Sequence, residues 1–423
     1  MLDQKLKYRR FKAYLEQVLG RTFTDDEFDN IAETLRVSLE QSVMMGYRYD
    51  KAVLNNPGYA DELFTLWITN QNDTQHLLDV MEIVANQNPN QPPVPPAPPS
   101  GGSNIVRFDP ILTLDDPDNC YFTGCRVNDQ MRFCTYKDGS QLVYMVDINR
   151  KELARFNAES GFMIIYYKGR YYLSLEHGQW GTVNRGMIMR LEANGNWYEV
   201  YRHPRWDLIT EMHVHTDGWL YASGNKWGTP SDPGGIVRTF DGDHWEVYYE
   251  RNDEVRSWGM TSLSSHLVTA GTTRGTDWGG NGCHPAIIVN KDLVWTDPDH
   301  EGSGFWAAEA WHADVFFGRC GEAGVVRLSD KKEVLSMPGF DAIHDLAIDK
   351  KTDTLLAFCN RPNNGGAVIK GTKTGNPGDW HTVGAALSVP SIIDAYYDDK
   401  EDVLYLMGGL FAGHGRVHRS IRA

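Results

Sequence analysis

A stretch of about 45 residues recurs along the sequence, and this repetition limits the possible folds more than any other feature. The clearest copy, Leu208 to Glu254, divides into four short segments of strand-like composition separated by three turns. Asp217-Gly218 and Asp241-Gly242-Asp243 have the composition of tight hairpin turns, whereas Gly224–Pro233 is a longer polar connection. This copy therefore predicts an antiparallel meander of four strands with a long middle loop.

The second segment of this meander has six equivalents elsewhere in the chain. With Leu220 as the marker, the markers follow one another at intervals of 40 to 49 residues, and the equivalents are Met131, Tyr171, Leu267, Val315, Leu355 and Leu404. A period of this length is typical of the four-stranded blades of a propeller, which stand radially around an axis. The sequence therefore predicts seven blades.

The last repeat is incomplete. It has a predicted second strand, Val403–Met407, and a predicted third strand, Gly415–Ile421, and the sequence ends there. Asn104–Leu114 reads as a strand and precedes the first complete repeat without a blade of its own. Because closing a ring removes exposed strand edges, we expect Asn104–Leu114 to complete the last blade.

The sequence before the repeats has a different character. Residues 1–87 carry apolar side chains at helical spacing and a capping box at Thr24-Asp25-Asp26-Glu27, which predicts a small all-α module. Residues 88–103 contain seven prolines followed by a glycine pair, which favours an extended spacer, with an SH3-type ligand as the alternative. The predicted organisation is a helical anchoring module (1–87), a spacer (88–103) and an all-β seven-bladed propeller (104–423).

Composition narrows the function classes. The formal net charge of −15 argues against a nucleic-acid-binding face, and no apolar run is long enough for membrane insertion. The charged start of the sequence does not match a signal peptide, so synthesis in the cytoplasm is expected. The six cysteines show no CxxC spacing, which favours buried apolar side chains over a disulfide framework or a metal site. No cofactor is expected.

Tryptophans in the predicted middle loops of three successive blades suggest a ligand site. Each stands next to a glycine and near polar side chains, and flat aromatic faces with such neighbours suit sugar rings. The alternative is that each tryptophan folds back over its own blade. Another tryptophan, near a blade entry, belongs to the same predicted face. The predicted ligand-binding residues are Trp180, Trp227, Trp278, Trp206, Asn225, Lys226 and Asp277.

Catalytic signatures are few. Glu211, His213 and His215 share one side of a predicted strand, which is compatible with a metal or acid–base set, although side chains that line the central channel are the favoured interpretation. Asp115–Asn119 is rich enough in oxygen ligands for calcium, with a plain turn favoured. Thr273–Trp278 matches the Asp-box of sialidases only in part. The sequence therefore predicts no catalytic residue and no metal site.

The repeat resembles that of seven-bladed β-propellers, without WD or kelch motifs. The overall plan resembles the virion appendages of tailed bacteriophages, of the tail-fibre or receptor-binding type. This resemblance implies a location on the virion, an N-terminal part (residues 1–103) held by other proteins of an oligomeric assembly, and a C-terminal domain that meets the host surface. Tyr59, Phe64 and Trp67 are the predicted anchoring residues.

The expected function is that of a structural and binding protein that recognises a host-surface glycan. The alternative is a glycan-cleaving enzyme, a sialidase-like glycoside hydrolase.

Overall fold

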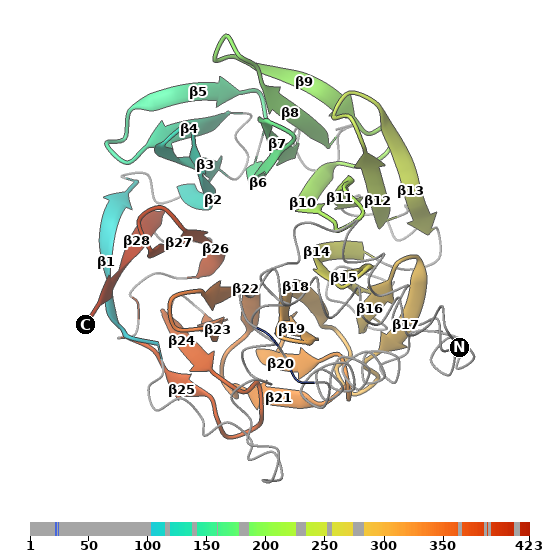
Figure 1. The fold of residues 1–423 in the computed structure, drawn as a ribbon, viewed down its shortest axis with the longest axis vertical. Coiled ribbons are helices and arrows are strands. Elements are labelled where there is room, and N and C mark those ends of the chain that lie inside the picture. Colours follow the sequence, from blue (N-terminus) through green and yellow to red (C-terminus); the bar gives the residue numbers. More distant parts are fainter. Residues whose placement is uncertain are drawn as a thin grey trace. The chain divides into compact units, whose positions relative to one another are not determined.

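The computed structural model describes Thr22, Thr24 and residues 103–423, except 115–118, 138–141, 159, 177–185, 226–233, 252–255, 274–282, 363–365, 385–386, 388–390 and 410–414. Within these residues, 28 strands form seven four-stranded antiparallel blades around a common axis (Figure 1). The described part of the chain is a seven-bladed β-propeller, as the repeat predicts.

In each blade the first strand lies nearest the axis and the fourth lies outermost (Figure 1). Blades 1 to 3 consist of β2 (Asn119–Val127), β3 (Gln130–Lys137), β4 (Val143–Asp147) and β5 (Glu152–Phe156); β6 (Ser160–Tyr167), β7 (Arg170–Glu176), β8 (Met187–Leu191) and β9 (Trp197–Arg202); and β10 (Leu208–Val214), β11 (Leu220–Asn225), β12 (Gly234–Thr239) and β13 (Trp245–Arg251).

Blades 4 to 6 consist of β14 (Arg256–Leu263), β15 (His266–Thr272), β16 (Pro285–Val289) and β17 (Asp292–Thr296); β18 (Gly304–Trp311), β19 (Asp314–Cys320), β20 (Gly324–Arg327) and β21 (Glu333–Ser336); and β22 (Ala342–Asp349), β23 (Thr354–Asn360), β24 (Ala367–Thr372) and β25 (His381–Thr382). Blade 7 consists of β26 (Ile392–Asp398), β27 (Val403–Gly408), β28 (Arg416–Arg422) and β1 (Ile105–Thr113).

Strand β1 closes the ring. It pairs antiparallel to β28, from Ile105 opposite Arg422 to Thr113 opposite Arg416. Blade 7 is therefore built from both ends of the propeller sequence, which confirms the prediction that Asn104–Leu114 completes the last blade.

The prediction of a small all-α N-terminal module is wrong as a statement of fold class, because the described residues contain no α-helix and the fold they form is all-β. Of residues 1–87 only Thr22 and Thr24 are described, and neither is helical. The other residues of the predicted module and its capping box lie outside the described residues. No helix in the described part of the chain could span a membrane.

Every first strand has an irregularity in its pairing with the second strand. A β-bulge of this kind bends a strand and redirects the side chains that follow it. Because the irregularity recurs in all blades, corresponding side chains reach the same level near the axis. The shifts lie between Tyr121 and Thr123, Gly161 and Met163, Ile209 and Met212, Ser257 and Met260, Phe305 and Ala307, Ile343 and Leu346, and Ile392 and Asp394.

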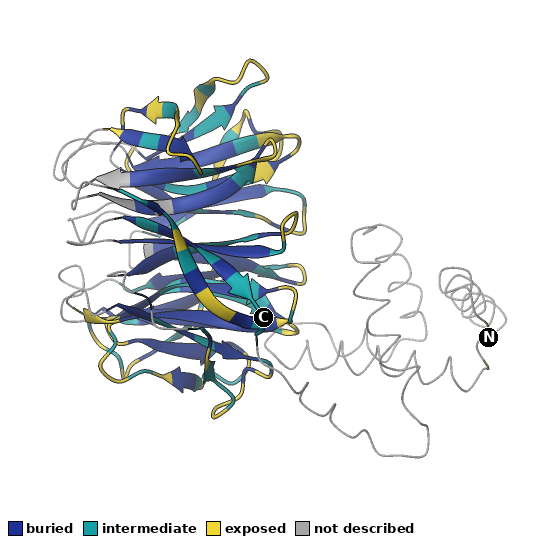
Figure 2. Ribbon diagram, turned by 90° about the vertical axis from the view of Figure 1, so that its left-hand side faces the viewer, coloured by how far each residue is buried: buried dark blue, intermediate teal, exposed yellow. Residues whose placement is uncertain are grey.

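The apolar core lies within and between the blades, whereas exposed residues concentrate on turns and outer strands (Figure 2). One cluster illustrates the contact between neighbouring blades, because Phe358 of blade 6 and Leu404 of blade 7 belong to it together with Phe108 of the closing strand. The hydrophobic effect therefore holds blades to one another as well as strands within a blade.

Candidate functional site

Most of the predicted ligand residues lie outside the described residues. These are Trp180, Trp227, Trp278, Lys226 and Asp277, which belong to the segments between the second and third strands of blades 2, 3 and 4. The anchoring residues Tyr59, Phe64 and Trp67 lie outside them as well, and so does the acidic stretch 115–118. Their roles stay predictions.

Trp206 is a core residue of the seam between blades 2 and 3. Its side chain is 0% exposed and stacks on the imidazole of His203, with ring centroids 3.8 Å apart. Its carbonyl oxygen accepts a hydrogen bond from Gly186 N at 2.7 Å. Sequence reasoning placed Trp206 on the ligand-facing rim, but in this structure it has no surface with which to contact a ligand.

Asn225 is also buried, with 1% of its surface exposed at the end of β11. Its position corresponds to that of Asn360 in blade 6, because their carbonyl oxygens accept equivalent hydrogen bonds from Asp207 N and Asp341 N. Asn360 uses its side-chain amide to bind Ile392 N and O in the next blade, at 2.7 and 2.9 Å. In contrast, Oδ1 and Nδ2 of Asn225 have no hydrogen-bond partner among the described residues.

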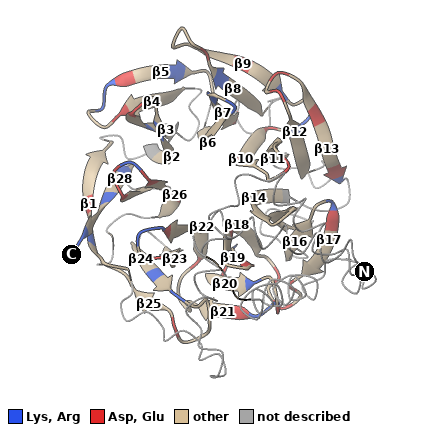
Figure 3. Ribbon diagram, in the orientation of Figure 1, with Lys and Arg blue, Asp and Glu red and all other residues tan. Residues whose placement is uncertain are grey.

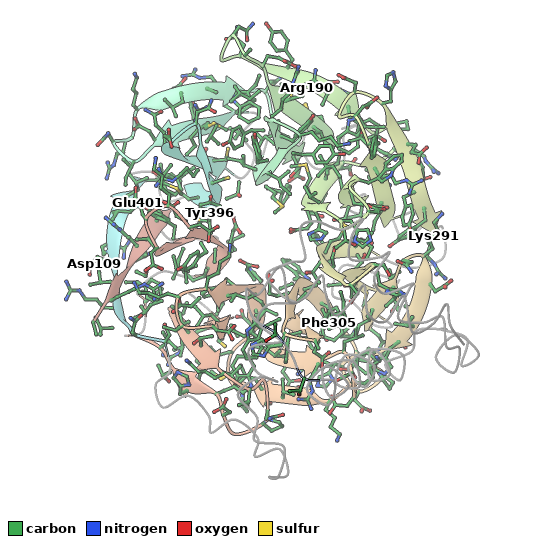
Figure 4. The ribbon with its side chains drawn as sticks, viewed as in Figure 1. Asp109, Arg190, Lys291, Phe305, Tyr396 and Glu401 are labelled. Atoms are coloured by element: carbon green, nitrogen blue, oxygen red, sulfur yellow. The ribbon has the colours of Figure 1, made fainter. Side chains whose placement is uncertain are left out.

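The candidate functional site is a group of acidic side chains on the strands nearest the axis. It consists of Glu211 on β10, Glu309 on β18, Asp345 on β22 and Asp394 on β26, and we call these four residues the central cluster. They come from blades 3, 5, 6 and 7, and all four are half-buried. Acidic positions are red in Figure 3, and Figure 4 labels Tyr396, two residues after Asp394.

Burial and mutual repulsion change the ionisation of the central cluster. Burial raises the pKa of Glu309 to about 8 and, despite hydrogen bonds that oppose it, the pKa of Asp394 to about 6. Burial followed by repulsion from the neighbouring carboxylates raises the pKa of Glu211 and Asp345 well above the ordinary range. At neutral pH the cluster therefore holds protons and presents both hydrogen-bond donors and acceptors.

Two members of the cluster have protein partners. Asp345 Oδ2 accepts a hydrogen bond from Ala395 N at 2.8 Å, which joins blade 6 to blade 7. Asp394 accepts hydrogen bonds from the Thr123 side chain and from the backbone of Gly124 in blade 1. The carboxyl groups of Glu211 and Glu309 make no hydrogen bond or ion pair with the described residues, so they are the more available for a ligand.

The two histidines that follow Glu211 bind a serine of the next blade. His213 Nε2 and His215 Nδ1 lie 2.6 and 2.7 Å from Ser262 Oγ on β14. The three side chains therefore do not form a metal set, and no group of three or more His, Cys, Asp or Glu side chains in the described ranges is placed to hold a metal ion.

Aromatic rings from three first strands stack near the central cluster. Trp306 of β18 lies between Trp258 of β14 and His344 of β22, with ring centroids 4.8 Å apart on each side. Burial lowers the pKa of His344 to about 4, so this ring is neutral at physiological pH. The stack joins blades 4, 5 and 6 around the axis.

The cysteines are buried apolar side chains in the part of the chain that the structure describes. Cys125, Cys134 and Cys359 are buried and form no disulfide with a described residue, Cys283 is buried, and Cys320 is half-buried. Burial raises the pKa of the Cys125 thiol to about 12, which makes it a poor nucleophile.

Sequence reasoning considered Glu211 but missed Glu309, Asp345 and Asp394. Each of the three lies on the first strand of its blade, and alignment of the repeats at their bulges places Asp345 and Asp394 at the level of Glu211. The sequence feature that could have revealed the cluster is an acidic residue at an inward position of a strand nearest the axis. This feature can be recognised only after the repeats have been aligned at this position.

Comparison with known proteins supports the fold and nothing finer. No protein-family model and no curated protein matches the sequence. Among solved structures, a streptogramin B lyase has a TM-score of 0.52 at 12% identity, over 77% of this chain and 100% of that chain. The extracellular domain of a one-component system of B. thetaiotaomicron has a TM-score of 0.48 at 12% identity, over 74% of this chain and 40% of that chain.

An oligogalacturonate lyase in complex with manganese has a TM-score of 0.46 at 11% identity, over 75% of this chain and 97% of that chain. The first of these likenesses shows a shared propeller-like fold. At such low identity it carries no activity over to this chain, because one fold supports many functions.

Proposed function

We propose that this chain is a binding protein of a tailed-bacteriophage virion, held in the virion through residues 1–103, and that its propeller recognises a host-surface glycan. The observation that supports the binding role is the central cluster. Carboxyl groups that are withdrawn from water without an ionic partner destabilise a fold, and such groups are typical of functional sites.

The propeller itself does not require acidic residues at this level. Blades 1, 2, 4 and 5 carry Thr123, Met163, Gly259 and Ala307 at the positions that correspond to Glu211, and Glu309 lies two residues after Ala307. Strand packing therefore does not require the acidic side chains of the central cluster, and ligand binding is a role that would. A hydroxyl-rich ligand suits these side chains, because each hydroxyl can donate to an ionised carboxylate or accept from a protonated one.

The test of glycan recognition is a glycan array probed with the purified full chain and with Glu211→Gln/Glu309→Gln. Both substitutions keep the side-chain shape, and neither removes a hydrogen bond to a described residue. We expect the double variant to lose at least about tenfold in affinity, which is a free-energy change of about 1.4 kcal/mol. Glu199→Gln, on the outer strand β9, is the control and should bind normally. Equal binding by all three proteins would reject the central cluster as the site.

A glycan-cleaving enzyme, such as a sialidase-like glycoside hydrolase, is the second candidate. The observation in its favour is that the pKa of Asp394, about 6, and that of Glu309, about 8, lie near neutrality, as acid–base catalysis requires. Any glycan that binds on the array should therefore be incubated with the full chain and assayed for new reducing ends. Their appearance, together with their loss in Glu309→Gln, would replace the binding role by a hydrolytic one.

The virion part of the proposal is tested separately. Deletion of residues 1–102 should abolish incorporation into virions, whereas the remaining propeller should still fold. Incorporation of the truncated chain at normal copy number would show that attachment does not depend on these residues.

A further inference from the structure

Blades 3 and 4 are joined by hydrogen bonds that converge on one serine. His213 Nε2 and His215 Nδ1 of blade 3 lie 2.6 and 2.7 Å from Ser262 Oγ of blade 4. Beside them, His215 Nε2 lies 3.2 Å from the Ser265 carbonyl oxygen, and Thr216 Oγ1 donates to the Ser264 carbonyl oxygen at 2.8 Å. We call His213, His215 and Ser262 the Ser262 latch.

The hydrogen-bond pattern determines where the protons of the latch lie. A carbonyl oxygen only accepts, so His215 must carry its proton on Nε2, and its neutral Nδ1 must accept from the Ser262 hydroxyl. A hydroxyl has one proton to donate, so His213 must donate to Ser262 Oγ from its own Nε2. With both imidazoles neutral, each of the three contacts has one donor and one acceptor.

Protonation of His215 removes this complementarity. The added proton would be on Nδ1, so both imidazoles would point a donor at Ser262 Oγ and the hydroxyl proton would lose its acceptor. Protonation of His213, on Nδ1, would place a second positive charge beside the first. Both changes weaken the contact between blades 3 and 4.

The surroundings keep the latch neutral at physiological pH. Burial lowers the pKa of His213 to about 4 and also lowers the pKa of His215, and Asp217 opposes the shift in both. On β11 the Tyr221 ring meets His215 edge-on at 5.6 Å, and its hydroxyl donates to Asp217 Oδ2 at 2.6 Å.

The other elements against β10 add one more basic group. His266 of β15 interacts with His215, and burial lowers its pKa as well. Strands β6 and β7 contribute the Tyr167 and Tyr172 phenols, which pack with Met212, and β10 itself contributes Glu211.

We propose that the Ser262 latch is an acid-sensitive contact that helps to hold blades 3 and 4 together at neutral pH and opens locally in acid. A second contact of the same seam provides an internal reference. There Thr210 Oγ1 and Ser223 Oγ lie 3.1 Å apart, and Ser223 Oγ donates to the Trp258 carbonyl oxygen at 3.3 Å. These groups do not titrate, so acid should open the latch while this reference contact stays closed.

The experiment is hydrogen exchange of the full chain at pH 7 and pH 4, followed by mass spectrometry and corrected for the intrinsic pH dependence of exchange. We expect peptides that cover 213–216 and 262–265 to lose about tenfold more protection in acid than peptides that cover Ser223 and Trp258. A tenfold change is what titration of one group over about one pH unit produces. Equal loss in both regions would overturn the proposal.

Two variants separate the latch from other effects of acid. Ser262→Ala removes the shared oxygen, so its latch peptides should exchange faster at pH 7 and respond less to acid. His213→Gln keeps an N–H donor and cannot titrate, so it should reduce the acid response without loosening the latch at pH 7. If Ser262→Ala does not fold, His213→Gln decides alone. A full acid response in the folded variants would contradict the proposal.

Discussion

Arg422 donates hydrogen bonds to both carboxylate oxygens of Asp349, from Nη1 at 3.0 Å and from Nη2 at 2.7 Å. The same guanidinium donates to Asn104 Oδ1 at 2.7 Å, immediately before β1. Ser103 and Thr352 also donate to Asp349, each at 2.7 Å. One buried carboxylate of blade 6 therefore holds the two strands that close the ring.

Removal of the Arg422 guanidinium should weaken the contact that closes the ring. Arg422→Ala leaves the carboxylate of Asp349, which is 0% exposed, without its cationic partner. We expect the free energy of unfolding to fall by about 3 kcal/mol, measured by urea denaturation at pH 7. Lys351→Ala is the control, because its pair with Asp402 is solvent-exposed and should contribute less than about 1 kcal/mol. Equal effects of the two substitutions would show that Arg422 does not close the ring.

The same contact predicts an acid dependence. Burial alone would raise the pKa of Asp349, but hydrogen bonds from Arg422, Ser103 and Thr352 outweigh it and lower this pKa. A carboxylate with a lowered folded-state pKa stabilises the fold above its unfolded pKa, and this stabilisation is lost as the pH falls. Arg422→Ala should therefore lower the melting temperature less at pH 3 than at pH 7. The control Lys351→Ala should show a smaller difference between the two pH values.

Replacement of the two corresponding asparagines should have opposite effects. Asn225→Leu removes a buried amide that has no partner in the described part of the chain, so we expect stability to stay the same or rise by about 1 kcal/mol. Asn360→Leu breaks two hydrogen bonds to Ile392 and leaves buried backbone groups unpaired, so we expect a loss of about 2 to 3 kcal/mol. Thermal unfolding of the two variants measures the difference. A comparable loss in Asn225→Leu would show that ordered water or a ligand binds this amide.

Gly224 should tolerate no side chain. A Cβ atom there would lie 2.3 Å from Trp206 Cε3 and 2.7 Å from the Leu208 carbonyl oxygen. Since neither the indole nor the strand can move freely, Gly224→Ala should destabilise the propeller by more than about 2 kcal/mol in urea denaturation. Gly195→Ala is the matched control, because it has a positive φ but no atom within 4 Å, and should cost about 1 kcal/mol. A smaller effect at Gly224 than at Gly195 would contradict the burial of Trp206.

The central cluster should destabilise the propeller as the pH rises. The pKa of Glu309 is raised to about 8, so its contribution to stability is fully present below pH 4 and is lost as the pH approaches 8. Glu309→Gln cannot ionise. Its melting temperature should exceed that of the parent by an amount that grows from pH 5 to pH 8. The corresponding difference in the free energy of unfolding is about 1 to 3 kcal/mol. A difference that does not depend on pH would mean that Glu309 ionises normally.

The helical prediction for residues 1–87 rested on the spacing of apolar side chains and one capping box, and apart from Thr22 and Thr24 these residues lie outside the described part of the chain. Short amphipathic segments form stable helices only when tertiary contacts support them, so helical spacing alone does not establish a helical module. The alternation in the repeats was a stronger signal, because seven copies of it follow one another at intervals of 40 to 49 residues.

The sequence by itself determined the propeller, the number of its blades and the strand that closes it, because alternation and turn chemistry are local properties of the chain. Only the tertiary structure decided which side chains meet. Glu211, Glu309, Asp345 and Asp394 are acidic residues of separate repeats until the blades close around the axis. Trp206 is a surface candidate until Gly224 and His203 enclose it. Burial and electrostatic interaction depend on neighbours from other blades, such as Asp349 for Arg422, 73 residues away.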